Sequence, residues 1–453
     1  MVLSNVSTLQ EQPSVQLSSR PNSSKKIYVE GYGCAANKFD LEIMLAHLAN
    51  AGYRLVESAD LSNVILINTC AVKKPTEDRI IGRIRLLSRL NKPLIIAGCL
   101  PKIDFKAVLK SAPDLSAALG PQDVDKILVA VRCAENGKRN VVFCSDRSIA
   151  KLEQPKIRLN PAIEIIAISE GCTGACTFCC VRFARGTLCS YPKETIVKRV
   201  SQAVSQGLKE IWLTSQDNGA YGLDIDEDLA ELLTECCRVD GKFMSRVGMM
   251  NPDHVSRILP KLIESYKNEK IFKFVHVPVQ SGDDATLARM NRRYTAKGFK
   301  KVVSKFRKEI PKVTLSTDVI CGFPGESREA FEKTVRLIED VEPDIVNISK
   351  FFARPRTPAM RMKQLDVTEV MDRSRKLTDL VKKISLDRNQ RWLNWEGEIL
   401  VDEKGRDSSW IGRNFAYKPI VVESHRNLAG KFLRARVNKA RSTFLEAEIV
   451  DYL

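Results

Sequence analysis

Residues 171–179 read Gly171-Cys172-Thr173-Gly174-Ala175-Cys176-Thr177-Phe178-Cys179 and directly follow an apolar run at 163–169. A CxxxCxxC loop brings three thiolates close enough to bind three corners of a cubane [4Fe–4S] cluster. The fourth iron is then open to a substrate, as an open position is at a catalytic zinc. A zinc site with Cys180 or Cys189 as the fourth ligand is the competing interpretation. Zinc loops favour paired CxxC units, and this triplet has no pair nearby, so the spacing favours the cluster.

Around this loop, short apolar runs alternate with amphipathic stretches. The apolar runs lie at 163–169, 211–214, 246–250, 272–277, 314–320 and 344–349, with amphipathic stretches at 193–206, 227–239, 253–267, 295–309 and 327–340. Six such units predict a partial (β/α)6 barrel, two units short of a closed one, whose functional side lies at the carboxyl ends of the strands. A charged stretch without Gly or Pro at 366–391 predicts a connecting helix.

Residues 26–128 alternate in the same way. Strands are expected at 27–32, 64–69 and 93–97 and helices at 37–51 and 76–90, which predicts a parallel, flavodoxin-like α/β sheet. Cys34, Cys70 and Cys99 each follow or end one of these strands. Because ligands bind outside the carboxyl ends of parallel strands, we expect these three thiols to converge on one site. Gly33 and Gly98 would let the backbone approach a ligand closely.

The sequence pattern of the last sixty residues differs from that of the two preceding regions. Alternating, β-branched segments at 398–402, 410–413, 418–422, 431–437 and 443–450 predict a compact β-barrel of the oligonucleotide-binding kind. Between Arg413 and Arg441 there are eight Lys or Arg and one acid, Glu423, which predicts a one-signed face for nucleic acid; a solubilising face is the alternative. The expected domains are a disordered tail at 1–25, an N-terminal domain at 26–150, a barrel at 151–390 and a β-domain at 391–453, with a hairpin and linker within 129–160.

The composition narrows the class of protein. The 453 residues suggest about three domains, and 44% hydrophobic with 28% charged residues is globular composition. The net charge of +17 favours a polyanionic partner, nucleic acid before membrane. No apolar run reaches the ~18 residues of a membrane span and no secretory signal is present, so we expect a cytoplasmic protein without a membrane partner. In a reducing cytosol, clustered thiols among 13 cysteines are more often metal ligands or nucleophiles than disulfides.

The whole pattern resembles the methylthiotransferases of the radical S-adenosylmethionine (SAM) superfamily. Members of this family carry an N-terminal domain with three separated cysteines, a radical barrel and a small C-terminal β-domain known as TRAM. Besides the triplet, the resemblance rests on Gly33-Cys34-Ala35-Ala36-Asn37, Asn68-Thr69-Cys70-Ala71-Val72, Ala97-Gly98-Cys99-Leu100-Pro101, Ala184-Arg185-Gly186, Val277-Pro278-Val279-Gln280-Ser281-Gly282 and Cys321-Gly322-Phe323-Pro324-Gly325-Glu326.

Two further stretches look most like the archaeal and eukaryotic branch that modifies N6-threonylcarbamoyladenosine in tRNA. They are Ile211-Trp212-Leu213-Thr214-Ser215-Gln216-Asp217-Asn218-Gly219-Ala220-Tyr221-Gly222 and Gly248-Met249-Met250-Asn251-Pro252. The resemblance implies an enzyme that inserts a methylthio group at C2 of this nucleoside, adjacent to the anticodon. Membrane-anchored eukaryotic members carry a hydrophobic C-terminal tail. This chain stops at Leu453 without one, so a soluble, archaeal member is expected.

The resemblance also implies two [4Fe–4S] clusters and SAM as cofactors. The radical triad (Cys172, Cys176, Cys179) would hold the cluster that binds SAM and cleaves it to a 5′-deoxyadenosyl radical, because no side-chain base can remove the C2 hydrogen. The auxiliary triad (Cys34, Cys70, Cys99) would hold a cluster that carries the sulfur. An electron donor of the flavodoxin or ferredoxin type and a sulfur source are the implied partners, beside the anticodon stem-loop of tRNA.

Several polar and aromatic side chains are expected to contact cofactor or RNA. The expected cofactor contacts are Phe178, Ser215, Gln216, Asp217, Gln280 and Ser281. The expected substrate contacts are Arg185, Arg413, Lys418, Arg434 and Arg436. A core aromatic is the alternative for Phe178, and a salt bridge is the alternative for Arg185. Residues 289–312 add ten Lys or Arg against the single acid Glu309, as expected if phosphates are held over the barrel mouth.

Two other functions stay open at this point. One is a radical SAM methylthiotransferase with a different target, either another tRNA adenosine or a ribosomal protein. The other, from a different class, is a zinc-containing RNA-binding protein without catalysis. The basic β-domain and the branch-specific stretches argue against the first, and analysis for iron, sulfide and zinc separates the second.

Overall fold

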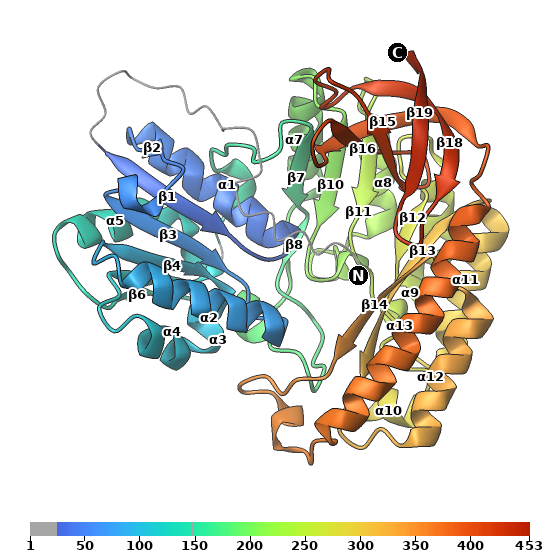
Figure 1. Cartoon of the computed structure of the whole chain (residues 1–453), viewed down its shortest axis with the longest axis horizontal. Helices are drawn as coiled ribbons and strands as arrows, with labels where there is room; N and C mark the ends of the chain where they lie inside the picture. Colours follow the sequence, from blue (N-terminus) through green and yellow to red (C-terminus); the bar gives the residue numbers. More distant parts are fainter. Residues whose placement is uncertain (1–24, 147–148) are drawn as a thin grey trace.

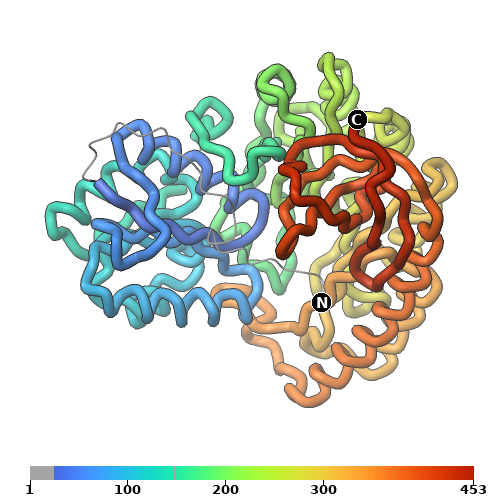
Figure 2. The backbone as a smooth tube through the Cα atoms, turned by 45° about the horizontal axis from the view of Figure 1, so that its top comes forward, coloured from blue at the N-terminus to red at the C-terminus, as the bar shows by residue number. Residues whose placement is uncertain are grey.

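The computed structural model describes residues 25–146 and 149–453 (Figure 1). Apart from Lys25, the tail expected at 1–25 lies outside the described residues. The N-terminal domain, in blue, lies on one side of the central barrel, and the C-terminal β-domain, in red, packs against another part of that barrel (Figures 1 and 2).

The N-terminal domain is built on a wholly parallel sheet with the order β2-β1-β3-β4-β5-β6. This order contains the flavodoxin-like 2-1-3-4-5 arrangement, so the expected fold class is confirmed. Helices cover both faces, and residues 64–67 of the central strand β3 are fully buried, as is usual for parallel sheets. The strands are β1 (Lys26–Gly31), β2 (Arg54–Leu55), β3 (Val64–Thr69), β4 (Leu94–Gly98), β5 (Ala117–Leu119) and β6 (Val141–Phe143), and the helices are α1 (Ala35–Asn50), η2 (Ala59–Leu61), α2 (Lys74–Ser88), α3 (Cys99–Ile103), α4 (Phe105–Ser111), η3 (Pro121–Lys126) and α5 (Ile127–Glu135).

The hairpin expected near Asn136-Gly137 does not form. Gly137 has φ +72° and ends α5, and the chain then enters β6, which pairs in parallel with β5. A Gly just after a helix is a usual C-terminal cap, so the same two residues that suggest a hairpin turn here serve a helix-to-strand connection.

The central barrel contains all six expected strands, among the described residues, as the sheets β11-β10-β7 and β12-β13-β14. An isolated parallel bridge from Ser245 to Ile271 joins the two sheets, which gives an open barrel. Several helices begin at side-chain caps, including Asp228, Asn251, Asp283, Thr295, Ser327 and Asp366.

The strands are β7 (Ile163–Ala167), β10 (Glu210–Thr214), β11 (Met244–Val247), β12 (Phe274–His276), β13 (Thr314–Cys321) and β14 (Ile345–Lys350). The helices are α7 (Lys193–Ser205), α8 (Leu229–Cys237), α9 (Pro252–Lys267), α10 (Asp284–Arg289), α11 (Ala296–Glu309), α12 (Arg328–Val341) and the connector α13 (Val367–Gln390). Shorter elements are η4 (Lys151–Glu153), β8 (Ser169–Glu170), α6 (Val181–Arg185), β9 (Cys189–Ser190), η5 (Asn218–Ala220) and η6 (Pro358–Arg361).

The C-terminal domain is a closed barrel with the order β15-β16-β17-β19-β18, as expected. It packs against the amino ends of the central strands: Tyr417 donates a hydrogen bond to Glu210 at the start of β10 (3.2 Å), and Lys418 pairs with Asp344 just before β14 (2.8 Å). The cysteine loop lies at the opposite, carboxyl end of these strands. The strands are β15 (Glu396–Lys404), β16 (Ser409–Arg413), β17 (Pro419–Glu423), β18 (Phe432–Ala440) and β19 (Leu445–Tyr452).

A buried carboxyl group lies at this junction. Burial, together with the nearby Asp402 carboxylate, raises the pKa of Glu210 to about 8. One oxygen of Glu210 accepts hydrogen bonds from Trp212 (2.6 Å) and Tyr417, and the other has no hydrogen-bond partner among the described residues. The folded protein therefore keeps a proton on Glu210 at pH values where the unfolded chain has lost it.

We predict that Glu210→Gln stabilises the protein at pH 8 and has little effect near pH 4.5. With the folded pKa near 8 and the unfolded value near 4.5, the free energy of unfolding falls as the pH rises through this window, and an amide removes that dependence. The expected gain at pH 8 is about 1–2 kcal/mol, read as a rise in the thermal unfolding midpoint. The matched control is Glu398→Gln at an exposed position; an equal gain in both variants would contradict the prediction.

Candidate functional site

The auxiliary triad comes together at the carboxyl edge of the N-terminal sheet. Cys34 precedes α1, Cys70 follows β3, and Cys99 begins α3 directly after β4. Cys70 and Cys99 are buried, and Cys34 is exposed at the open side. Burial, with Cys99 and Cys34 close by, raises the pKa of Cys70 to about 12. Sequence reasoning thus placed three distant thiols correctly at one edge of the sheet.

Side-chain amides tie the three cysteine-bearing loops together. Asn37 donates from Nδ2 to the carbonyl oxygens of Tyr32 (3.0 Å) and Thr69 (2.8 Å), so it joins the ends of β1 and β3. Asn68 donates back to the Asn37 carbonyl oxygen at 2.7 Å. The Thr69 hydroxyl donates to the carbonyl oxygen of Ala97 at 2.6 Å, which attaches the end of β4. The spacing of the thiols is therefore set by the protein before any cluster binds.

The fold requires a glycine at position 98 for a reason other than the expected close approach of a ligand. Its φ is +95°, and a Cβ atom there would lie 2.4 Å from the Thr69 carbonyl oxygen. The close approach is thus to the neighbouring strand end, which brings Cys99 next to Cys70. A side chain at this position would push the two loops apart.

The radical triad lies in a loop after β8 at the carboxyl end of the central barrel. The amide of Gly174 donates to the Cys172 sulfur at 3.2 Å. A Cβ atom at Gly174 would lie 3.2 Å from the sulfur of Cys172 and 3.6 Å from that of Cys176, so the loop folds around both sulfurs. Burial raises the pKa of Cys172 and of Cys179. Binding a cluster must therefore drive thiol deprotonation in this loop.

The sulfur spacing bears on the choice between a cluster and a single ion. Within the described parts of the chain, no three His, Cys, Asp or Glu side chains lie close enough together to hold one metal ion. The ligands of a cubane bind separate iron atoms, so their sulfurs lie farther apart than those around one ion. The donor set, three thiols and no carboxylate, suits iron–sulfur ligation.

The segments that carry the two triads meet at the contact between the domains. Cys180, next to Cys179 of the radical triad, donates its thiol to the carbonyl oxygen of Ala71, next to Cys70 of the auxiliary triad (3.4 Å). Cys70, Cys99 and Cys180 belong to one buried hydrophobic cluster. Two cysteine sets from different domains thus flank a single junction.

Three family models match the chain. The model of the radical SAM superfamily matches residues 166–338, that of uncharacterized protein family UPF0004 matches 26–120, and that of the TRAM domain matches 396–450. The probable threonylcarbamoyladenosine tRNA methylthiotransferase of Pyrococcus horikoshii is 42% identical over 427 residues, which cover 94% of this chain and 99% of that protein. This chain belongs to the threonylcarbamoyladenosine tRNA methylthiotransferase family. Membership of the radical SAM superfamily implies SAM and a [4Fe–4S] cluster as cofactors.

Other relatives of this methylthiotransferase agree. The threonylcarbamoyladenosine tRNA methylthiotransferase of Xenopus laevis is 34% identical and covers 99% of this chain and 81% of its own length. Among solved structures, the radical S-adenosylmethionine methyltransferase TsrM from Kitasatospora setae has a TM-score of 0.56 at 13% identity, covering 74% of this chain and 75% of that one, which supports the fold. No helix within the described residues is both long and apolar enough to cross a membrane.

Among the expected cofactor contacts of the methylthiotransferase, two are already occupied by protein groups. Asp217 accepts from the amides of Gly219 (3.1 Å) and Asn251 (3.0 Å) with one oxygen and bonds His254 with the other (2.8 Å). Ser281 is fully buried; its hydroxyl accepts from the Asp283 amide and bonds Thr334. Both side chains thus hold loops in place, and their expected contact with the cofactor stays a prediction.

The other expected cofactor contacts lie in the radical loop or just after the ends of strands, and their roles stay predictions. Gln216 Oε1 is shielded from solvent and has no hydrogen-bond partner among the described residues. Gln280 has φ +67° beside β13, where its backbone bonds Asp318 and Ile320. Ser215 accepts from the Asp217 amide at 3.1 Å. Phe178 meets the ring of Phe323 edge-on, with centroids 6.5 Å apart, so part of its surface is packing surface.

Arg185 is not an RNA contact in this structure. Its side chain is 2% exposed and pairs with Asp40 of α1 at 2.7 Å; it also donates to Asn37 Oδ1 at 2.6 Å. The expected role is corrected, because the guanidinium is enclosed between the two domains. Arg185 instead links the radical barrel to the helix that orders the auxiliary triad.

The basic side chains expected to bind RNA on the TRAM barrel are paired with acids in the structure. Lys418 is buried with its ammonium on Asp344, and Arg413 is mostly buried against Asp402 (2.9 Å). Arg434 and Arg436 are exposed, yet both pair with Glu396 at 2.8 Å. The face is not one-signed, because β15 and β19 bring acids beside the basic strand β18.

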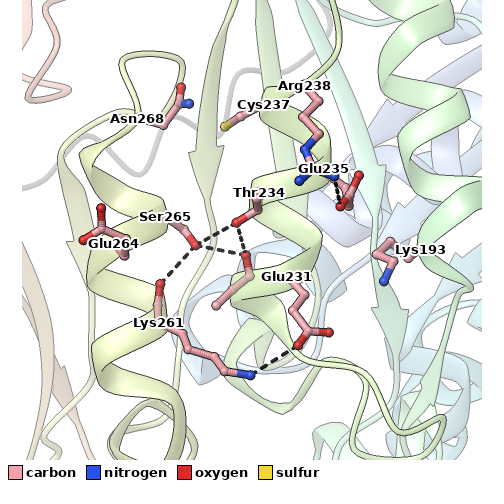
Figure 3. Close-up of a pocket in the computed structure, with 11 residues that line it drawn as sticks. Lys193, Glu231, Thr234, Glu235, Cys237, Arg238, Lys261, Glu264, Ser265 and Asn268 are labelled. Carbon is pink, nitrogen blue, oxygen red and sulfur yellow. Dashed lines mark hydrogen bonds and ion pairs between the residues drawn. The ribbon is translucent and has the colours of Figure 1, made fainter.

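Two hollows lie near the helices and loops of the barrel. A depression of about 690 Å³ lies between α8 and α9 (Figure 3), where Lys261 reaches Glu231 at 3.2 Å. Its lining contains no cysteine of either triad, so it is separate from the site. A smaller hollow of about 300 Å³ borders Cys172 and is lined also by Thr173, Arg182, Thr187, Leu188, Leu223 and Asp224.

Sequence reasoning missed several residues that contact the cysteine loops. Asn37 lies inside a quoted motif, and its place three residues after Cys34 was the available signal. His254 lies in no quoted motif, yet its ring bonds Asp217 at 2.8 Å. Arg292 was counted as part of a basic stretch, but its guanidinium donates to the Cys176 sulfur at 3.3 Å.

We predict that Arg185→Met destabilises the fold rather than weakening RNA binding. Removing the guanidinium leaves the buried Asp40 carboxylate with Lys151 as its remaining charged partner, and breaking such pairs costs about 3–5 kcal/mol. The check is the urea midpoint, beside tRNA affinity of the folded protein. Arg182→Met, on the exposed side of the same short helix, is the control for stability. Unchanged stability with lost tRNA affinity would show that Arg185 contacts RNA.

Proposed function

We propose that this protein inserts a methylthio group at C2 of N6-threonylcarbamoyladenosine, adjacent to the anticodon of tRNA, giving 2-methylthio-N6-threonylcarbamoyladenosine. Relatives in archaea and in animals bear the name threonylcarbamoyladenosine tRNA methylthiotransferase. The observation that carries the proposal is the contact between Cys180 and Ala71, which sets one cysteine triad against the other. A reaction that needs a radical and a sulfur at the same carbon calls for such a pair of sites.

The radical triad would hold one [4Fe–4S] cluster, which together with SAM supplies the radical chemistry that activates an unactivated C–H bond. The chain's own residues bind and orient. Gln216, two residues after the end of β10, offers a shielded amide oxygen that a polar group of the cofactor can satisfy. Gln280 lies at the same end of the barrel. Asp217 fixes the loop that carries Gln216.

The auxiliary triad would hold a second cluster, which stores the sulfur to be inserted. Two of its thiols are buried and Cys34 is exposed, so Cys34 is the thiol of this triad that solvent can reach. While no cluster is bound, Asn37 Oδ1 accepts from the Cys99 thiol at 3.6 Å, which keeps Cys99 in register with the strand ends. A small electron donor and a sulfur source complete the reaction, and we place it in the cytoplasm with its tRNA.

Exposed cations around the triads would hold the anticodon stem-loop. Lys73 follows Cys70, Arg182 follows Cys179, Lys350 ends β14, and Arg361 lies in η6, whose Ala359 amide donates to Thr177 inside the radical loop. All four are exposed and form no ion pair with another described residue. We call these four residues the mouth cations. Free cations attract phosphates more strongly than the paired Arg434 and Arg436, which must first leave Glu396.

The experiment that tests the function is nucleoside mass spectrometry after anaerobic reaction with two tRNA substrates, threonylcarbamoylated and unmodified. We expect a methylthio product from the first alone. The reconstituted protein should carry about eight irons, and replacement of either triad by Ala should leave about four irons and no product. A four-iron variant that still forms the product would refute the two-cluster proposal. Zinc without iron or acid-labile sulfide would establish the zinc-containing, non-catalytic alternative.

We predict that Lys350→Ala/Arg361→Ala weakens tRNA binding and flattens its salt dependence. Each lost phosphate contact reduces the slope of log K against log salt by about 0.7–0.9, so the double variant should lower it by about one to two. Arg434→Ala/Arg436→Ala is the matched control with two paired arginines. An equal or larger decrease of this slope in the control would show that the TRAM barrel makes the main RNA contact.

A further inference from the structure

A short segment from the far side of the barrel lies along the radical loop. The Thr177 amide donates to the Met290 carbonyl oxygen (3.1 Å), and the Thr177 hydroxyl donates to that of Arg289 (2.8 Å). Asn291 donates from its side chain to the Ala175 carbonyl oxygen at 2.8 Å. Residues 289–292 therefore hold in place the stretch that carries Cys176, although more than a hundred residues separate the two segments in sequence.

Arg292 adds a further contact to this loop through its guanidinium. All three guanidinium nitrogens donate hydrogen bonds. Nη1 donates to the sulfur of Cys176 at 3.3 Å, Nη2 to Asn251 Oδ1 at 3.2 Å, and Nε to the Tyr294 hydroxyl at 2.9 Å. That hydroxyl lies 3.0 Å from the carbonyl oxygens of Pro278 and Val279. The cation is thus held at one orientation with one edge on a cysteine sulfur.

The partner of Arg292 belongs to a chain of hydrogen bonds that returns to the same loop. The Asn251 amide donates to Asp217, and Asp217 bonds His254. The other ring nitrogen of His254 lies 3.5 Å from the Thr173 hydroxyl. The radical loop is therefore contacted at Thr173 and at Cys176 by one connected set of groups, which runs through the backbone amide of Asn251 as well as through side chains. Arg292 is the member that touches a cysteine sulfur.

We propose that Arg292 is a positioning residue that holds Cys176 and raises the reduction potential of the cluster on the radical triad. The inference rests on the proposed function only in requiring that this triad carries a cluster. Hydrogen bonds to ligand sulfurs set the potentials of iron–sulfur clusters. Reduction adds negative charge, and a fixed cation 3.3 Å from a ligand sulfur stabilises the reduced form.

An arginine suits this task better than a lysine. The guanidinium is planar and always charged, and its fork can donate to a sulfur and to an amide at the same time. A lysine keeps the charge but concentrates its donors on one atom. Arg293, the next residue, is exposed and has no such contact, so solvent and salt screen its charge. The two adjacent arginines therefore form a matched pair for an experiment.

The test is a redox titration followed by electron paramagnetic resonance, on the full chain with Cys34, Cys70 and Cys99 replaced by Ala so that one cluster is read. We expect Arg292→Gln to retain about four irons and to lower the ratio of reduced to oxidised cluster about tenfold at a fixed solution potential. That is a shift of about 59 mV for one electron. Arg293→Gln should leave the potential unchanged, and Asn251→Ala should give a smaller shift of the same sign.

The outcomes separate this inference from the proposed function. An unchanged potential in Arg292→Gln with iron retained overturns the inference alone. A parent protein whose radical triad binds no iron overturns the proposed function and the inference together. If Arg292→Gln loses its iron, Asn251→Ala, which keeps Arg292 but removes the amide oxygen that orients it, decides: a potential below that of the parent supports the inference, and a potential equal to that of the parent overturns it.

Discussion

The arrangement of the whole site depends on buried charges between α1 and the central barrel. The Asp40 carboxylate forms ion pairs with Lys151 at 2.7 Å and with Arg185 at 2.7 Å, and Lys151 also pairs with Glu170 at 2.6 Å. Asp40, Lys151 and Arg185 are 1–2% exposed, and such charges are stable only while their partners stay in place. Asp40 lies about one turn after Asn37 on the same helix. The contact that docks the domains therefore also orders the auxiliary triad against the radical triad.

Much of the fold could be read from the sequence because its parallel strands are short, apolar and separated by amphipathic helices. The expected barrel strands appear within three residues of their observed bounds, since burial on both faces leaves a clear apolar run. β6 was missed because three half-exposed residues carry no such signal. The Asn136-Gly137 turn was misread because positive-φ turns serve helix ends as well as hairpins.

The cysteines could be placed because strand ends of one sheet share an edge, whatever their distance in sequence. Side-chain direction could not be read in the same way. Arg185 and Lys418 look like surface cations in the sequence, and only the packed domains show that each is enclosed with a carboxylate. The charge count from Arg413 to Arg441 likewise missed Glu396, because the acids that neutralise β18 come from β15 and β19.

The TRAM barrel and the cysteines occupy opposite ends of the central strands. Its hydrophobic core draws on residues from 392 onward and includes no cysteine of either triad. A substitution inside that core and a substitution in a cysteine loop therefore lie at opposite ends of the central strands. Because the effects of distant substitutions on the free energy of unfolding usually add, a chain that carries both changes loses the sum of the two single losses.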